Sequence, residues 1–120
     1  MSVTLYHNPR CSKSRATLQL LQDKGIEASV VKYLETPPDA KTLDELLRLL
    51  GLQPRQLMRR NEPEYMDNHL DDESLDRETL IQAMVDHPRL IERPIVVTEH
   101  DGQRRAAIGR PPETVLEILP

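Results

Sequence analysis

Residues 6–15 read Tyr-His-Asn-Pro-Arg-Cys-Ser-Lys-Ser-Arg and contain the only cysteine of the 120-residue chain. The stretch joins a β-prone run, residues 3–6, to a helix that the sequence predicts from Ser12 onward. A cysteine in this position lies at the positive end of the helix macrodipole, beside backbone N–H groups without intrahelical partners. Both features favour the thiolate, which is the nucleophilic form of cysteine, and free N–H groups can also hold an anion. The stretch therefore predicts a nucleophile and an anion site in one turn.

A free cysteine can also be a small buried apolar residue, and this alternative has to be weighed for Cys11. The neighbours of Cys11 are polar, and Arg10, Lys13 and Arg15 bring three cations close to it in sequence. Pro9 also interrupts regular strand pairing just before it. Reactive thiols occupy such electropositive surroundings, so the reactive reading is favoured.

The residues around this stretch predict a βαβ unit. The helix over 12–24 should end at Gly25, where a left-handed residue is commonly needed. Residues 28–34 are rich in β-branched side chains and predict a second strand. Two strands joined through one helix by short connections are expected to run parallel, with a right-handed crossover.

The middle of the chain predicts a helical block. A first helix is expected to begin with Thr36 as N-cap and to end at Gly51. A short helical piece over 55–60 and an acidic stretch over 61–74, either irregular or one weak helical turn, should follow. Asp76 then caps a helix that ends before Pro88.

The last third predicts a β-hairpin and a final helix. Strands are expected over 95–98 and 104–108 around a turn that contains Gly102, and a helix carries Val115, Leu116, Ile118 and Leu119. The complete order is that of an α/β, thioredoxin-like fold: βαβ, then ββα, with a helical insertion at about residues 37–90 between the halves. We expect one domain over residues 1–120. Pro94 precedes the third strand, where this topology typically has a cis-proline.

Composition excludes several classes of protein. The net charge of −4 and the absence of Trp and Phe oppose a nucleic-acid-binding surface. No apolar run approaches the length of a membrane span. A single cysteine forms no internal disulfide, which is typical of a reducing cytoplasm, and the scattered histidines give no metal-ligand spacing. We therefore expect a cytoplasmic protein without a bound metal or cofactor. No sustained apolar stripe is left over for a dimer, so we also expect a monomer.

Three arginines are candidates for binding an anion beside Cys11: Arg59, Arg93 and Arg110. Arg93 and Arg110 flank the two strands of the hairpin, so the topology brings both to the end of the sheet that carries the Cys11 loop. A guanidinium group is always charged and can bind a tetrahedral oxyanion through two parallel hydrogen bonds. This arrangement indicates an anion site beside a thiolate.

Over essentially its whole length the chain resembles the glutaredoxin-coupled arsenate reductase family. The matching pieces are residues 6–9 with Cys11 and Ser14-Arg15, residues 57–61, residues 92–97 and residues 109–111. The resemblance implies a nucleophile at Cys11, an arginine triad at Arg59, Arg93 and Arg110, arsenate as substrate, and glutathione and glutaredoxin as partners. One departure follows the nucleophile: Ser12-Lys13 replaces the Gly-Thr of well-characterised members, which removes a glycine and adds a charge.

The remaining candidates lie in the Cys11 loop, where His7, Asn8, Ser14 and Arg15 are expected to bind the substrate. His7 is either close to the sulfur, where its protonated form would stabilise the thiolate, or an exposed residue at the strand end. The resemblance predicts an enzyme that reduces arsenate to arsenite through a Cys11–arsenate adduct. The alternatives are a thiol reductase with another substrate and a non-catalytic regulator that binds RNA polymerase.

Overall fold

The computed structural model describes residues 1–120, which form two compact units. The sheet unit consists of Met1–Thr36 and Arg93–Pro120, and the helical unit of Pro37–Glu92. The helical insertion expected at about residues 37–90 lies within the second of these ranges. Neither unit has a helix long and apolar enough to cross a bilayer.

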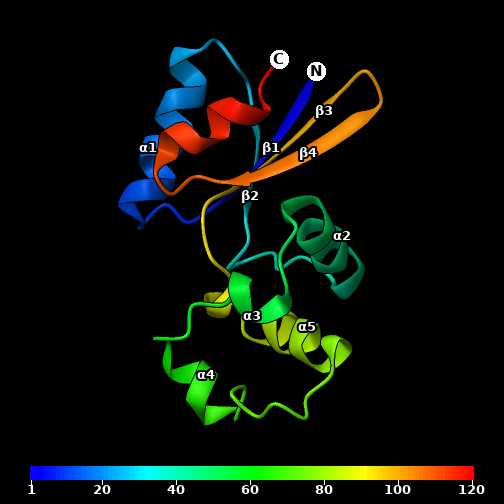
Figure 1. Ribbon diagram of the computed structural model, residues 1–120. Coiled ribbons are helices and arrows are strands. Elements are labelled where there is room, and N and C mark those ends of the chain that lie inside the picture. The colour runs from blue at the N-terminus through cyan, green and yellow to red at the C-terminus, as the bar shows by residue number, and fades with distance from the viewer. The chain divides into compact units, whose positions relative to one another are not determined.

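The sheet unit contains four strands (Figure 1) in the order β2-β1-β3-β4. The strand β1 is parallel to β2 and antiparallel to β3, which is antiparallel to β4. The elements are β1 (Ser2–His7), α1 (Ser12–Asp23), β2 (Ser29–Lys32), β3 (Ile95–His100), β4 (Gln103–Ile108) and η2 (Pro112–Ile118). This topology confirms the predicted βαβ unit followed by a hairpin and a helix.

Two elements of this unit differ from the prediction. The strand β2 covers only part of residues 28–34, because the chain turns directly after Lys32, where the N–H groups of Glu35 and Thr36 both bond to the Lys32 carbonyl. The last helix, η2, is a 3₁₀-helix rather than an α-helix. Pro111 is its N-cap and Pro112 its first residue, and the Thr114 N–H donates to the Pro111 carbonyl, an i→i+3 bond of the 3₁₀ type.

The core of the sheet unit lies between the sheet and the two helices α1 and η2. Its buried residues come from β1, α1, β3, β4 and η2, namely Val3, Leu5, Leu21, Val96, Ala107 and Val115. Gly25 ends the segment after α1 with φ 73°, and the Ile26 N–H reaches the Leu21 carbonyl at 2.9 Å. This bond belongs to a Schellman motif, and it confirms the predicted stop and packs Ile26 against the core.

The buried face of α1 is partly polar. Ser14 and Thr17 are 0 % exposed, as is Leu21 one turn further on, whereas Ala16 is exposed. Buried hydroxyls need hydrogen-bond partners, and Thr17 Oγ1 donates to the Lys13 carbonyl at 2.9 Å. The helix therefore presents hydroxyl groups to the interior at the end that carries Cys11.

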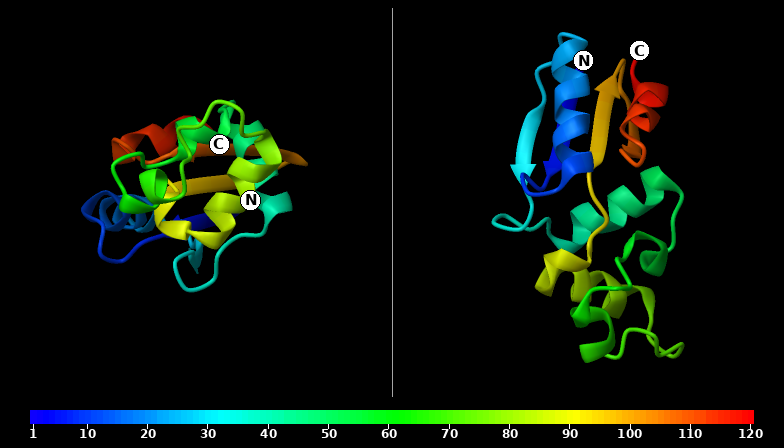
Figure 2. Two further views of the ribbon diagram at one scale, coloured as in Figure 1. Left: turned by 90° about the horizontal axis from the view of Figure 1, so that it is seen from below. Right: turned by 90° about the vertical axis from the view of Figure 1, so that its left-hand side faces the viewer.

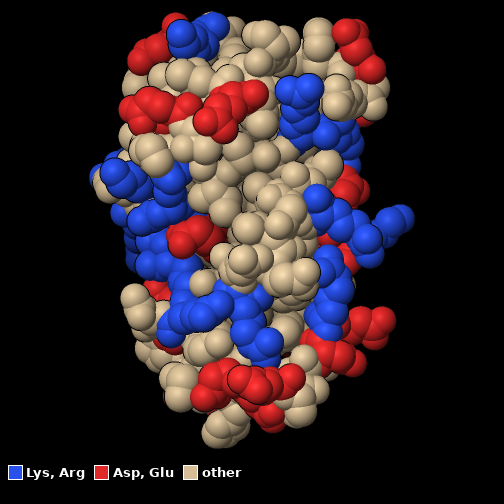
Figure 3. All heavy atoms as spheres, viewed as in Figure 1, with Lys and Arg blue, Asp and Glu red and all other residues tan.

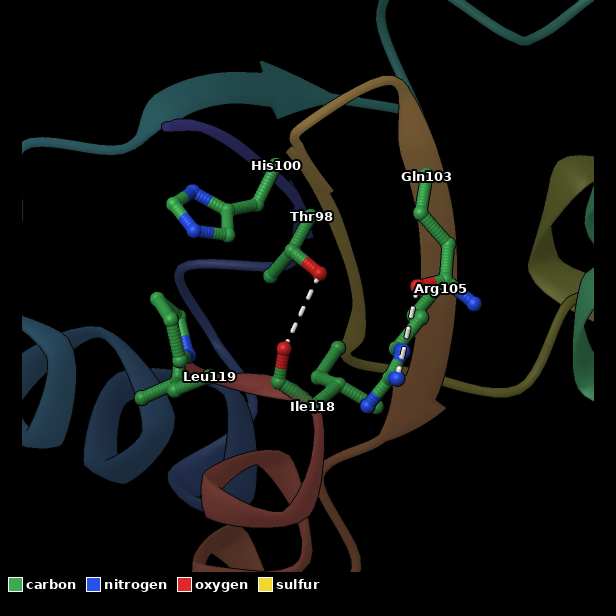
Figure 4. A pocket seen from close by; sticks show the side chains of 7 residues that line it. Thr98, His100, Gln103, Arg105, Ile118 and Leu119 are labelled. Atoms are coloured by element: carbon green, nitrogen blue, oxygen red, sulfur yellow. Dashed lines mark hydrogen bonds between the residues drawn. The ribbon is translucent and has the colours of Figure 1, made fainter.

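A hydrogen bond attaches the end of η2 to the sheet (Figure 4). Thr98 Oγ1 donates to the Ile118 carbonyl at 3.1 Å, beside a cavity of about 110 Å³ that also contacts His100, Gln103 and Arg105. The hairpin turn between β3 and β4 has positive φ at both Asp101 and Gly102. This geometry matches the glycine-containing hairpin turn that the sequence predicted.

The helical unit buries the apolar faces of its two longer helices. Its elements are α2 (Ala40–Leu50), α3 (Pro54–Leu57), α4 (Pro63–Asp67), α5 (Arg77–Asp86) and η1 (Pro88–Leu90). The predicted N-cap at Thr36 is wrong: Asp39 caps α2 and accepts a hydrogen bond from the Thr42 N–H. Residues that precede a proline avoid the helical conformation, so Pro37-Pro38 delays the helix. The predicted cap at Asp76 is confirmed for α5.

Gly109 lets the end of β4 approach α1 closely. A Cβ atom at this position would overlap Thr17 Oγ1 and Pro94 Cγ. We expect Gly109→Ala to lower the free energy of unfolding by about 1–3 kcal/mol, the usual cost of forcing extra volume into a packed site. Urea denaturation followed by circular dichroism measures this change. The loss should shrink in a Thr17→Ala background, and an equal loss in both backgrounds would contradict the proposed overlap.

Candidate active site

The nucleophile candidate Cys11 is the N-cap residue of α1. The turn before it is closed by the Cys11 N–H, which donates to the Asn8 carbonyl at 3.0 Å, and the Arg15 N–H donates to the Cys11 carbonyl at 3.0 Å. The residue is only 8 % exposed. Besides burial, the groups that act on its thiol are the backbone N–H groups of Ser14 and Lys13 and the guanidinium groups of Arg93 and Arg110.

Opposing effects determine the pKa of the Cys11 thiol, and their balance lowers it. Burial raises the pKa, but the Ser14 N–H, the Arg93 charge, the Lys13 N–H and the Arg110 charge together outweigh it. A hydrogen bond to the charged form and a nearby opposite charge both stabilise a thiolate. The first turn of α1 thus supplies the N–H groups that the sequence predicted.

The cations that act on the sulfur come from the hairpin. Arg110 Nη1 lies 3.9 Å from Cys11 Sγ and also donates to the Arg93 carbonyl at 3.3 Å. The charges of Arg10, Lys13 and Arg15, which are close in sequence, are not among those that lower the thiol pKa. The sheet register therefore contributes more to the site than sequence proximity does.

A buried network lies beneath the Cys11 turn. His7 is 5 % exposed, and its Nδ1 atom lies 2.7 Å from Ser14 Oγ, which also accepts from the Asn8 N–H at 3.0 Å. The reading of His7 as an exposed strand-end residue is therefore wrong. Burial, together with the charges of Lys32 and Arg15, lowers the His7 pKa. The neutral imidazole is consequently favoured, not the cation that would stabilise a thiolate directly.

Asn8 and Arg15, two predicted substrate ligands, bond to the loop itself. Asn8 Oδ1 accepts from the Arg10 N–H at 3.0 Å, and Arg15 Nη1 donates to the Pro9 carbonyl at 3.1 Å. The hydroxyl of Ser14, a third predicted ligand, is engaged by His7 and Asn8. These contacts hold the turn in the shape that directs N–H groups toward the sulfur.

The structure places Pro94 and Arg59 in different units. The Arg93–Pro94 peptide bond is cis, as predicted for this position, and so is the Arg110–Pro111 bond, which the sequence analysis did not predict.

Arg59 belongs to the helical unit, where its Nη1 atom lies 2.7 Å from Glu62 Oε1. Glu62 is also bound by Arg89 at 2.9 Å. The sheet unit therefore brings together Cys11, Arg93 and Arg110.

Sequence reasoning missed two contributors to this region. Lys32 acts on His7 because the parallel pairing sets these two residues side by side. Gly109 has an ordinary φ, so no turn pattern marks it. The available signal for Lys32 was its place at the carboxyl end of a predicted strand parallel to the strand that leads to Cys11.

The lowered thiol pKa leads to a measurable pH dependence. We expect the alkylation rate of Cys11 by iodoacetamide to rise with pH around a midpoint below the value of about 8.5 for free cysteine. Arg93→Ala should move the midpoint upward, whereas Lys24→Ala, an exposed change at the far end of α1, should leave it unchanged. A group with a depressed pKa in the folded state stabilises the fold above its unfolded pKa, and this stabilisation is lost as the pH falls through the folded pKa. A wild-type midpoint at or above that of free cysteine would contradict the arrangement.

The sheet unit combines a thioredoxin-like topology with a site made from one cysteine and two hairpin arginines. These features place the protein in the thioredoxin-like class. The ArsC family model matches residues 6–118, and the chain belongs to this family. It is 58 % identical over 118 residues to the Escherichia coli (strain K12) "Uncharacterized protein YfgD", which covers 98 % of this chain and 96 % of that protein. It is 47 % identical over 118 residues to an arsenate reductase of Neisseria meningitidis, covering 98 % and 97 % of the two chains.

A solved structure resembles the whole chain. The arsenate reductase from Vibrio cholerae superposes with a TM-score of 0.91 at 53 % sequence identity, covering 99 % of this chain and 98 % of that one. The predicted resemblance to arsenate reductases with a thioredoxin-like fold is therefore confirmed.

Proposed function

We propose that this protein is an oxidoreductase that reduces arsenate to arsenite with Cys11 as nucleophile. The observation that carries the proposal is the position of Arg110 Nη1, 3.9 Å from the sulfur of Cys11 at the N-cap of α1. The charges of Arg93 and Arg110 also contribute to the lowered pKa of this thiol. Relatives named arsenate reductase, 47 % identical over nearly the whole chain, support arsenate as the substrate.

The first step forms a covalent adduct. The Cys11 thiolate attacks arsenic, so that one S–As bond forms and one As–O bond breaks. The departing oxygen takes up protons and leaves as water, and arsenic stays in the As(V) state. Arg93, Arg110 and the N–H groups of the first turn of α1 stabilise negative charge on the arsenic oxygens as it develops.

The second step requires electrons from outside the chain, because Cys11 is the only cysteine. An external thiol attacks the Cys11 sulfur, and the electron pair of the S–As bond passes to arsenic, which leaves as arsenous acid after protonation. Cys11 is then in a mixed disulfide with the external thiol. A second thiol reduces this disulfide and restores the Cys11 thiolate, so two thiols are oxidised for each arsenate reduced.

Glutathione as the first thiol and glutaredoxin as the second donor belong to this proposal. Arg59 is its third oxyanion-binding arginine. His7, Asn8, Ser14 and Arg15 act by positioning the turn, with anion contacts made through backbone N–H groups. The protein acts as a monomer in the reducing cytoplasm. It needs no bound cofactor. It also binds no nucleic acid, which is supported by the acidic side chains interspersed among the basic ones on the face in Figure 3.

The test is an arsenate reduction assay with purified protein and glutathione, with and without glutaredoxin, in which arsenite is measured directly. We expect turnover that saturates with arsenate below about 1 mM, within the usual range of Michaelis constants. Stimulation by glutaredoxin supports the donor assignment. Turnover of a glutathionylated protein with no arsenate turnover would instead favour a thiol reductase with another substrate. Neither activity, together with retention of RNA polymerase subunits in a pull-down, would favour the regulator.

A further inference from the structure

A cavity of about 270 Å³ borders the Cys11 turn on the side of β2. One wall is the segment that leads to the nucleophile, residues 7–10, and the other is Lys32 at the end of β2 with Leu34 and Glu35 directly after it. The right-hand view of Figure 2 shows the carboxyl end of β2, in cyan, beside the loop that leads into α1. Parallel strands of open α/β sheets commonly bind ligands outside their carboxyl ends. The cavity occupies that position for β1 and β2.

The charges around this cavity are available to a ligand. Arg10 and Lys32 are exposed cations, and Glu35 is an exposed carboxylate. None of these three side chains takes part in an ion pair within the protein. Leu34 is 39 % exposed and adds an apolar surface. The lining can thus bind two carboxylates, one ammonium group and a short aliphatic segment.

His7 adds a buried polar edge to the same cavity. Its Nδ1 atom is occupied by Ser14 Oγ at 2.7 Å, so Nε2 is the ring nitrogen left for a ligand. Lys32 lies opposite His7 in the parallel register, and its charge acts on the imidazole. The ammonium group of Lys32 and the imidazole of His7 therefore face a common space.

We propose that this cavity binds the external thiol, and that the thiol is a small peptide-like molecule with two carboxylates and one ammonium group. This inference rests on the proposed function, which requires such a thiol. The carboxylates bind Arg10 and Lys32, and the ammonium group binds Glu35. Arg10 directly precedes Cys11, one Cα–Cα step of about 3.8 Å along the chain, and an extended tripeptide spans about 10 Å. In this proposal the thiol bound at Arg10 extends along the turn to the neighbouring Cys11 and attacks its sulfur as described for the second step.

Binding can be measured without any redox chemistry. S-Methylglutathione keeps the charges of glutathione but has no thiol, and its dissociation constant is obtained by isothermal titration calorimetry. We expect Arg10→Ala and Lys32→Ala each to raise this constant about tenfold or more, because each removes a charge-assisted hydrogen bond. Lys24→Ala removes an exposed cation of the same sheet unit and should leave the constant unchanged. Equal dissociation constants for wild type, Arg10→Ala and Lys32→Ala would overturn the proposal.

Steady-state kinetics gives a second readout. In Arg10→Ala and Lys32→Ala the KM for glutathione should rise about tenfold, while the KM for arsenate and the pH midpoint of Cys11 alkylation stay at their wild-type values. Dithiothreitol carries no charge, so turnover with dithiothreitol should be equal in wild type and both variants. A parallel loss with dithiothreitol would contradict a thiol-binding role. S-Methylglutathione binding that depends on Arg10 and Lys32, without arsenate turnover in the wild type, would refute the proposed function and leave the binding site standing.

Discussion

Replacing Cys11 with serine is expected to reduce arsenate turnover to the rate measured without protein. A serine hydroxyl stays protonated at neutral pH and is a weak nucleophile unless a base activates it, and the Nδ1 atom of His7 is engaged by Ser14. The adduct with arsenic therefore cannot form. Without a second cysteine in the chain, no other residue can take over the role of the nucleophile.

The fold should survive this substitution. Serine is close to cysteine in size and is a favoured N-cap residue, so the free energy of unfolding should stay within about 1 kcal/mol of the wild-type value. Arsenite production and urea denaturation, measured on the same preparation, separate chemistry from folding. Residual turnover in Cys11→Ser above the protein-free rate would end the proposed mechanism, because the adduct requires this sulfur.

Replacing Arg110 with alanine is expected to lower kcat for arsenate reduction by about 10²–10³, the usual effect of removing one oxyanion-stabilising group. Arg110 Nη1 is 3.9 Å from Cys11 Sγ, and its charge contributes to the lowered thiol pKa. The variant should therefore also alkylate more slowly at neutral pH, with its midpoint moved upward. Both effects have the same cause, which is the loss of a fixed positive charge beside the sulfur.

Two further variants separate charge from geometry. Arg110→Lys keeps the charge but loses the planar fork that binds two oxygens, so its alkylation midpoint should lie near the wild-type value while its kcat remains reduced. Arg105→Ala removes an exposed arginine of β4 that donates to Gln103 Oε1, and it serves as the matched control. An Arg110→Ala variant with wild-type kcat and KM would show that Arg110 does not stabilise the reacting anion.

The parts of this molecule that the sequence predicted correctly are those with a short-range signal. The single cysteine at a strand–helix junction, the stop at Gly25, the cap at Asp76 and the hairpin at Gly102 each depend on a few adjacent residues. Arg93 and Arg110 were found because they flank strands whose pairing the topology determines. The resemblance to the arsenate reductase family then assigned Cys11 and these arginines to one site.

The parts that failed depend on packing. Ser14 and Thr17 occupy the buried face of α1 because hydrogen bonds satisfy their hydroxyls: His7 and Asn8 contact Ser14 Oγ, and Thr17 Oγ1 donates to the Lys13 carbonyl of the same helix. The sequence predicts Thr36 as the cap of α2, but Asp39 is the cap, because Pro37 and Pro38 keep the residues before them out of the helical conformation. The neutral state of His7 also follows from burial, which residue spacing along the chain does not reveal.

The pairing of β3 with β4 limits the number of residues that can separate Arg93 and Arg110 in the sequence. Ile95 pairs with Ile108, and the pairing continues outward from the turn toward Pro94 and Gly109. Adding one residue to each strand at the Asp101–Gly102 end would lengthen the hairpin and leave Arg93 and Arg110 in place. Adding a residue to one strand alone would reverse the faces of its side chains and separate the pair. Among proteins built this way, even changes in arginine spacing are compatible with the site, whereas odd changes require a bulge.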